Sequence, residues 1–150
     1  MTTIHADVQA SPQDVYAVLI DPYAYAKWVV GSKRVRSVDP NWPAVGARFH
    51  HTVGPPGVDI DDSSKLLELE ENRRVVLEVR FRPAGVAVVA IELDSRDDDR
   101  RTHITMTEQP KSGPVRRWWS KPLAAATSLR NVISLRRLAR LCEQRAHAPA

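Results

Sequence analysis

Residues 114–146, PVRRWWSKPLAAATSLRNVISLRRLARLCEQRA, decide the fold of this 150-residue chain. Apolar side chains recur there at three- and four-residue spacing, which is the period of an amphipathic helix. The predicted stripe consists of Ala125, Leu129, Val132, Leu135, Ala139 and Cys142, widened by Leu138 and Leu141. Arg130, Arg137 and Gln144 are predicted on the opposite side. The pattern indicates a helix of roughly 25–30 residues, ~40 Å long, which needs a large apolar partner.

The segments before this helix supply that partner as a series of short strands. The predicted strands are residues 2–8, 33–39, 46–53, 58–69, 74–82, 85–94 and 101–109. The later ones are separated by Glu71-Asn72, Pro83-Ala84 and residues 96–100, which are short enough for hairpins. The sequence therefore predicts an α+β fold, in which a curved antiparallel sheet of about six to seven strands wraps around the long helix.

Two cap-and-proline pairs follow the first predicted strand. Ser11 is a good N-cap and Pro12 suits the first helical position. Asp21-Pro22 repeats the signal and opens a second helical segment that runs to Trp28. Two short helices are therefore expected between the first and second strands.

Composition and charge exclude several classes of protein. Cys142 is the only cysteine, so neither an intramolecular disulfide nor a cysteine-based metal site is expected. The longest apolar run, residues 86–91, is far shorter than the ~20 residues that span a bilayer. The N-terminus lacks a signal-peptide pattern, so we expect a cytoplasmic protein. The length of 150 residues predicts a single domain over residues 1–150, as a monomer or homodimer. The basic C-terminal helix invites a nucleic-acid interpretation, but such binding is not expected, because no recognition motif is present and the acidic residues of the other strands and loops would oppose a phosphate backbone.

Three segments carry a resemblance to a known family. Residues 11–28, with Ser11-Pro12 and Trp28, resemble the opening of the SRPBCC superfamily, the START-like and birch-pollen-allergen-like helix-grip proteins. Residues 42–51 and 108–114, the latter leading into Arg130-Asn131, resemble its polyketide cyclase/dehydratase-like branch. The resemblance covers nearly the whole chain. It implies a helix-grip fold with a hydrophobic cavity between sheet and helix, and it implies no cofactor.

Two polar residues fall on the apolar faces of predicted strands. His51 lies between Phe49 and Val53, and Glu108 is in line with Met106. A histidine and a carboxylate in one apolar interior could act as an acid–base pair. Burial raises the pKa of a carboxylate and lowers that of a histidine, so that both move toward neutral pH. In the alternative interpretation His51 bonds a core neighbour, and Glu108 meets solvent or an arginine. No metal site is expected, because His50 and His51 face opposite ways on one strand.

The remaining inward positions form an almost wholly aliphatic wall. The residues expected to contact a ligand are Tyr25, Trp28, Phe49, Leu77, Val79, Val89, Ile91, Met106, Trp118 and Asn131. The preferred hypothesis is a carrier or sensor that binds a hydrophobic small molecule, such as a lipid, a polyketide or an aromatic metabolite. The first alternative is a cyclase/dehydratase-type enzyme that uses His51 and Glu108. The second is a protein-interaction module that acts through the basic C-terminal helix.

Overall fold

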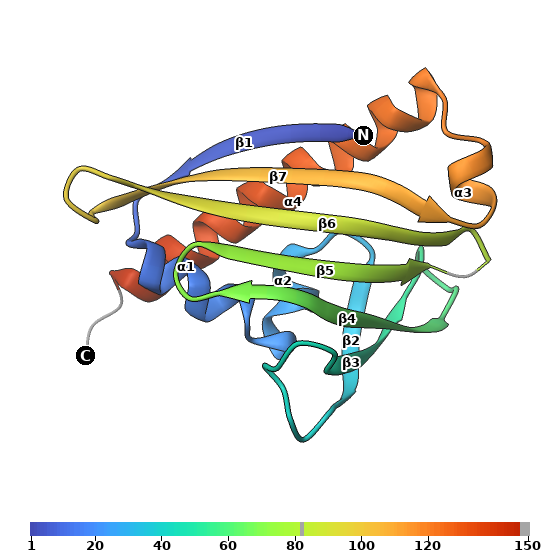
Figure 1. Cartoon of the computed structure of the whole chain (residues 1–150), viewed down its shortest axis with the longest axis horizontal. Coiled ribbons are helices and arrows are strands. Elements are labelled where there is room, and N and C mark those ends of the chain that lie inside the picture. The colour runs from blue at the N-terminus through green and yellow to red at the C-terminus, as the bar shows by residue number, and fades with distance from the viewer. Residues whose placement is uncertain (82, 148–150) are drawn as a thin grey trace.

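The predicted strands form one antiparallel sheet in the computed structural model, which describes residues 1–81 and 83–147. The sheet has the order β1-β7-β6-β5-β4-β3-β2, so that β2 to β7 form a meander and β1 pairs with β7 (Figure 1). The strands are β1 (Thr2–Val8), β2 (Ser32–Val38), β3 (Arg48–Val53), β4 (Ile60–Glu70), β5 (Arg74–Phe81), β6 (Gly85–Arg96) and β7 (Arg101–Ser112). This architecture confirms the predicted α+β helix-grip fold.

Strand boundaries differ from the prediction mainly in the β6–β7 hairpin. The two strands were expected to span residues 85–94 and 101–109, but the ladder begins at the pair Arg96 and Arg101 and β7 continues to Ser112. Backbone hydrogen bonding extends the ribbon past the core, where charged side chains are exposed and apolar alternation has ended. Arg82, the last residue of the predicted 74–82 strand, lies outside the described residues.

The helices begin where the capping signals predicted. The Ser11 hydroxyl accepts a hydrogen bond from the backbone N–H of Asp14 at 3.1 Å, and the Asp21 carboxylate accepts one from Tyr23 at 3.1 Å. The helical elements are α1 (Pro12–Leu19), the 3₁₀ turn η1 (Pro22–Ala24), α2 (Tyr25–Trp28), α3 (Pro114–Arg117) and α4 (Lys121–Ala146). The 26 residues of α4 agree with the predicted length.

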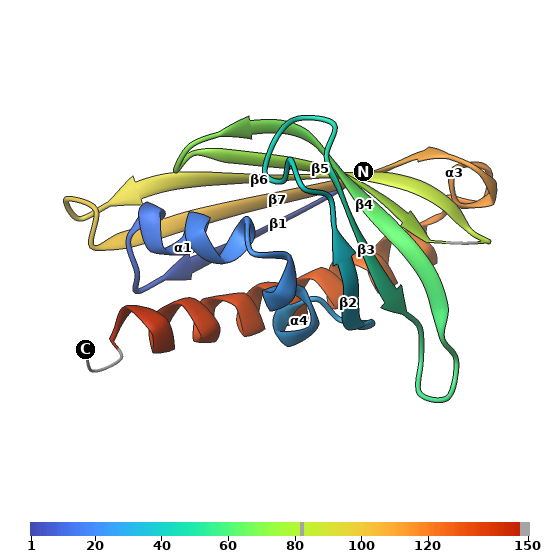
Figure 2. The same cartoon turned by 90° about the horizontal axis from the view of Figure 1, so that it is seen from below.

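The long helix α4 lies along the inner face of the curved sheet, with α1 and α2 beside it (Figure 2). Leu135, Leu138 and Cys142 are buried as predicted. The prediction was wrong at the N-terminal end of the stripe, because Ala125 is exposed and the Leu129 side chain is 64% exposed. The helix α4 packs mainly against β1, α2 and α1. Helical periodicity identifies an apolar face, but it does not say which turns of that face are covered.

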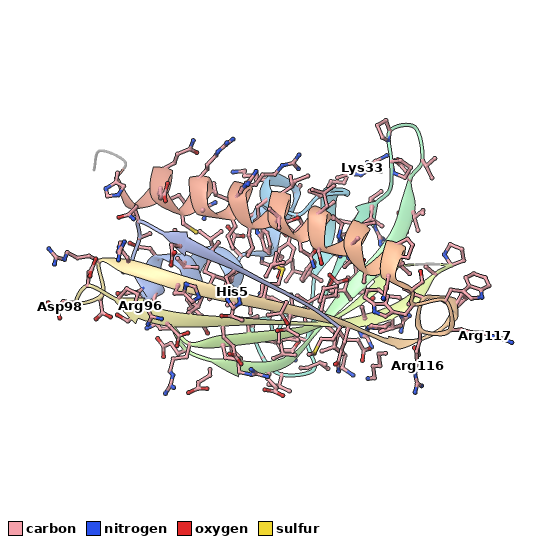
Figure 3. All side chains as sticks on the ribbon, turned by 90° about the horizontal axis from the view of Figure 1, so that it is seen from above. His5, Lys33, Arg96, Asp98, Arg116 and Arg117 are labelled. Carbon is pink, nitrogen blue, oxygen red and sulfur yellow. The ribbon has the colours of Figure 1, made fainter. Side chains whose placement is uncertain are left out.

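Side chains fill most of the space between α4 and the sheet, whereas Arg116 and Arg117 of α3 project away from it (Figure 3). The described core includes Phe49, Leu66 and Ile104, none of which is exposed to solvent. The space that remains between the layers is therefore small, and its position is decided by the few places where these side chains do not meet.

Candidate functional site

A cavity of about 70 Å³ lies between the sheet and α4. Eight residues expected to contact a ligand line it: Tyr25, Trp28, Leu77, Val79, Val89, Ile91, Met106 and Asn131. Both residues of the predicted acid–base pair, His51 and Glu108, line it as well. The alternation of β3, β5, β6 and β7 brings these side chains to one face, because every second residue of a strand points to the same side.

A second, more open depression of about 330 Å³ adjoins this cavity. We call it the mouth, and it is lined mainly by the loop after α2, the end of β3, the start of β4 and part of β5. Val29, His51, Val79 and Arg130 line both spaces. These four side chains therefore stand at the junction through which a molecule in the mouth would reach the cavity.

The structure places Phe49 and Trp118 away from the cavity wall. Phe49 is fully buried, with its ring centroid 4.6 Å from that of Tyr25 and 5.2 Å from that of His51. Trp42 closes the other side of Phe49 in an edge-on contact. Phe49 thus supports two residues of the wall from behind. Trp118 is 69% exposed and lines neither the cavity nor the mouth.

Glu108 is buried and bound by side chains of α4. Nη2 of Arg130 donates to both carboxylate oxygens, at 2.8 and 2.7 Å, and Nδ2 of Asn131 donates to Oε2 at 2.7 Å. Arg130 had been predicted on the outer side of the helix, and this prediction was wrong. Its long side chain bends inward while remaining 38% exposed, because an arginine stem can follow the protein surface and deliver its head to a partner.

His51 is buried and has one free ring nitrogen. Its Nε2 lies 3.3 Å from the Ser64 hydroxyl, whereas Nδ1 has no hydrogen-bond partner among the described residues. Burial lowers the pKa of His51 below its usual value, with Arg36 and His50 adding to this effect and Asp62 opposing it. The imidazole is therefore neutral at pH 7, and it can accept or donate a hydrogen bond depending on its tautomer.

The lowered pKa of His51 predicts acid sensitivity. Below pH ~6.5 the imidazole of the unfolded chain takes up a proton, whereas the native imidazole stays neutral to a lower pH. The free energy of unfolding is therefore unaffected by protonation of His51 above this pH and decreases as the pH falls below it. We expect His51→Gln to remove up to ~1.4 kcal/mol per pH unit from the slope of unfolding free energy between pH 6.5 and 5.5. Urea unfolding at pH 7.5, 6.5 and 5.5 measures this. Ser64→Ala leaves the imidazole buried and should retain the slope, and equal slopes for wild type and His51→Gln would contradict the prediction.

Four residues of the cavity wall were not predicted as ligand contacts. They are Val29, Ser64, Arg130 and Ser134. Ser64 pairs with Phe49 across the β3–β4 ladder, so the inward position of Phe49 could have revealed it once the register was known. Ser134 lies three residues after Asn131 on α4, which puts both on one helix face. Arg130 belongs to the Arg130-Asn131 pair of the family resemblance, which was a signal for it, whereas Val29 had none.

Other kinds of site find no support in the part of the chain that the structure describes. No group of three or more histidine, cysteine or acidic side chains there could hold a metal ion. Likewise, none of the helices within residues 1–81 and 83–147 is long and apolar enough to cross a membrane.

Solved structures share this fold over nearly the whole chain. Protein NE0264 from Nitrosomonas europaea is 21% identical, with a TM-score of 0.72 over 96% of this chain and 94% of that chain. The ZhuI aromatase/cyclase from Streptomyces sp. R1128 is 17% identical, with a TM-score of 0.75 over 98% and 95%. The di-domain aromatase/cyclase StfQ of the steffimycin pathway is 15% identical, with a TM-score of 0.70 over 97% of this chain and 51% of that one.

The sequence comparisons place the chain in a family. No curated protein sequence matches it significantly. The family model described as Activator of Hsp90 ATPase homolog 1-like protein matches residues 9–129. The two aromatase/cyclase structures share with this chain the helix-grip fold that the sequence resemblance implied. The chain therefore belongs to the Activator of Hsp90 ATPase homolog 1-like family of the SRPBCC superfamily.

Proposed function

We propose that this protein binds a hydrophobic small molecule, which enters through the mouth and reaches the cavity between the sheet and α4. The observation that carries the proposal is the wall itself. Leu77, Val79, Val89, Ile91 and Met106 present apolar side chains to the cavity from three neighbouring strands. A concave apolar surface with a few placed polar groups is typical of a small-molecule site.

Size narrows the class of ligand. Typical small-molecule pockets measure about 300–1,000 Å³, so the cavity of about 70 Å³ takes only one end of a ligand. The mouth, at about 330 Å³, has room for its body. These dimensions favour an aromatic metabolite of one or two rings over a long-chain lipid or an extended polyketide.

Blocking the cavity should weaken ligand binding. We expect 2-naphthol, a two-ring probe, to bind the wild-type protein, and Val89→Trp to weaken this binding at least ~10-fold, about 1.4 kcal/mol. Val88→Trp is the matched control, because Val88 lies on the opposite face of the same strand and does not line the cavity. It should change the dissociation constant less than ~3-fold. Isothermal titration calorimetry measures both, and urea unfolding checks that each variant is folded.

Native mass spectrometry of the purified protein provides an independent test. A co-purified apolar molecule, displaced by 2-naphthol, would support the proposal. An unliganded mass together with no detectable binding of 2-naphthol to the wild-type protein would refute it.

A cyclase/dehydratase activity based on an acid–base pair has weaker support from the geometry. Both oxygens of Glu108 already accept hydrogen bonds from Arg130 and Asn131, which is the arrangement of an ionised carboxylate that acts as an acceptor. In the same wall, Nδ1 of His51 has no hydrogen-bond partner in the described part of the chain. The geometry therefore favours binding with His51 as a polar contact over proton exchange between two groups.

A further inference from the structure

Two buried polar atoms belong to side chains of the cavity wall and lack hydrogen-bond partners. They are Nε1 of Trp28 and Nδ1 of His51, and neither has a partner among the described residues. The side chains are 2% and 4% exposed, so bulk water does not satisfy them. Buried polar atoms in folded proteins are nearly always paired, since an unpaired one loses its hydration without compensation. Thr2 Oγ1 and Ser32 Oγ are also buried without a partner among the described residues, but neither residue lines the cavity, so Trp28 and His51 are the wall residues that offer such atoms to a ligand there.

The partner atom must be an acceptor, because an indole N–H only donates. His51 is compatible with either role. If Nε2 carries the proton and donates to Ser64, then Nδ1 accepts a hydrogen bond from a hydroxyl. In the other tautomer Nδ1 donates to a carbonyl oxygen. A phenolic hydroxyl matches this pair of atoms in the first tautomer, and a ketone oxygen matches it in the second.

Charge in the cavity wall favours a neutral ligand. Arg130 offsets the carboxylate of Glu108 at 2.7 Å, and the lowered pKa of His51 leaves its imidazole uncharged. The fourth titratable side chain of the wall, Tyr25, is buried, and burial raises its pKa so that its hydroxyl is neutral. An ionised ligand group would be desolvated with no free countercharge from these residues, which is costly in an apolar interior.

We propose that the ligand is a neutral phenol or ketone, whose oxygen-bearing end occupies the cavity and pairs with Trp28 Nε1 and His51 Nδ1 while its apolar body lies in the mouth. This inference rests on the proposed function. It also accounts for the small volume of the cavity, about 70 Å³, because only the polar end enters it.

Three probes of similar size test the inference by calorimetry at pH 7.5. They are 2-naphthol, its isostere 2-methylnaphthalene without the oxygen, and the anionic 2-naphthoate. We expect 2-naphthol to bind at least ~10-fold more tightly than either of the others, which is about 1.4 kcal/mol. Trp28→Phe, which keeps an aromatic ring and removes the N–H, should reduce the preference for 2-naphthol over 2-methylnaphthalene below ~3-fold. His51→Phe should also reduce it.

Trp42→Phe is the matched control. Trp42 donates from Nε1 to the carbonyl of Ile20 at 2.8 Å and does not line the cavity. This variant should lose stability but keep the wild-type preference among the probes. A second readout is an NMR titration of the wild-type protein itself. The Nε1–H resonance of Trp28 in a ¹H–¹⁵N spectrum, assigned by its loss in Trp28→Phe, should move downfield with 2-naphthol and not with 2-methylnaphthalene.

The outcomes separate the two proposals. Equal binding of 2-naphthol and 2-methylnaphthalene, with no downfield shift of the Trp28 resonance, would overturn the oxygen-bearing ligand and leave the hydrophobic binding function standing. Tighter binding of 2-naphthoate would overturn its neutrality. Binding of none of the three probes to wild-type protein whose native mass shows no bound molecule would overturn both the inference and the function on which it rests.

Discussion

Replacement of Phe49 by alanine is expected to lower the free energy of unfolding by about 3–5 kcal/mol. The Phe49 ring is fully buried and contacts the rings of Tyr25, Trp42 and His51, with centroids 4.6, 5.2 and 5.2 Å away. Truncation removes the buried area and the ring contacts together, and the surrounding aromatic groups are too rigid to close the space. Urea-induced unfolding measures the change, which should appear as a lower midpoint at a similar slope.

Two further variants make this test specific. Tyr23→Ala is the matched control, because Tyr23 is an aromatic residue that is 64% exposed, and its loss should cost about 0.5 kcal/mol or less. Phe49→Leu should retain part of the stability. Since Phe49 supports the wall without lining it, Phe49→Leu should also change the affinity for 2-naphthol less than ~3-fold. A loss of stability in Phe49→Ala no greater than that in Tyr23→Ala would show that the ring does not anchor the core.

Removal of Arg130 is expected to have the second largest effect, a loss of about 2–4 kcal/mol. Among the described residues, Arg130→Ala leaves the buried carboxylate of Glu108 with only the Asn131 amide as a hydrogen-bond donor. Breaking a buried ion pair from one side typically costs about 3–5 kcal/mol, because the remaining charge is uncompensated. We place the value lower because the Arg130 side chain is 38% exposed, so that solvent already screens part of the interaction.

A double-mutant cycle isolates this interaction. Glu108→Gln removes the charge that Arg130 offsets, so Arg130→Ala should cost at least ~1.5 kcal/mol less in that background than in the wild type. Arg137→Ala is the matched control on α4, because Arg137 is exposed and should contribute within about 0.5 kcal/mol of zero. Additive effects of the two substitutions, or an Arg130→Ala loss equal to that of Arg137→Ala, would argue against a stabilising pair.

Local patterns were sufficient for most of the fold. Alternation in β3 predicted that Phe49 and His51 share the inner face, and both are buried. The serine–proline and aspartate–proline signals located the starts of α1 and η1. These features are local because a strand or a helix cap is defined by the backbone geometry of a few consecutive residues.

The candidate site was predictable only in part. Glu108 was expected on the inner face and lies there, but its partner Arg130 was assigned to the wrong side of α4. Trp118 was expected to contact a ligand and instead projects into solvent. The position of the Arg130 head depends on how its long side chain bends, and the exposure of Trp118 depends on where one element lies over another; spacing within an element encodes neither.

The sequence by itself determined the order of the elements, the faces that the strands turn inward, and an aliphatic wall interrupted by His51 and Glu108. Only the tertiary structure decided that Glu108 is paired with Arg130, that Nδ1 of His51 lacks a partner within residues 1–81 and 83–147, and that the cavity measures about 70 Å³. The physical reason is that side-chain direction follows the short period of a strand or helix. The volume between layers depends instead on how side chains from distant segments pack against one another.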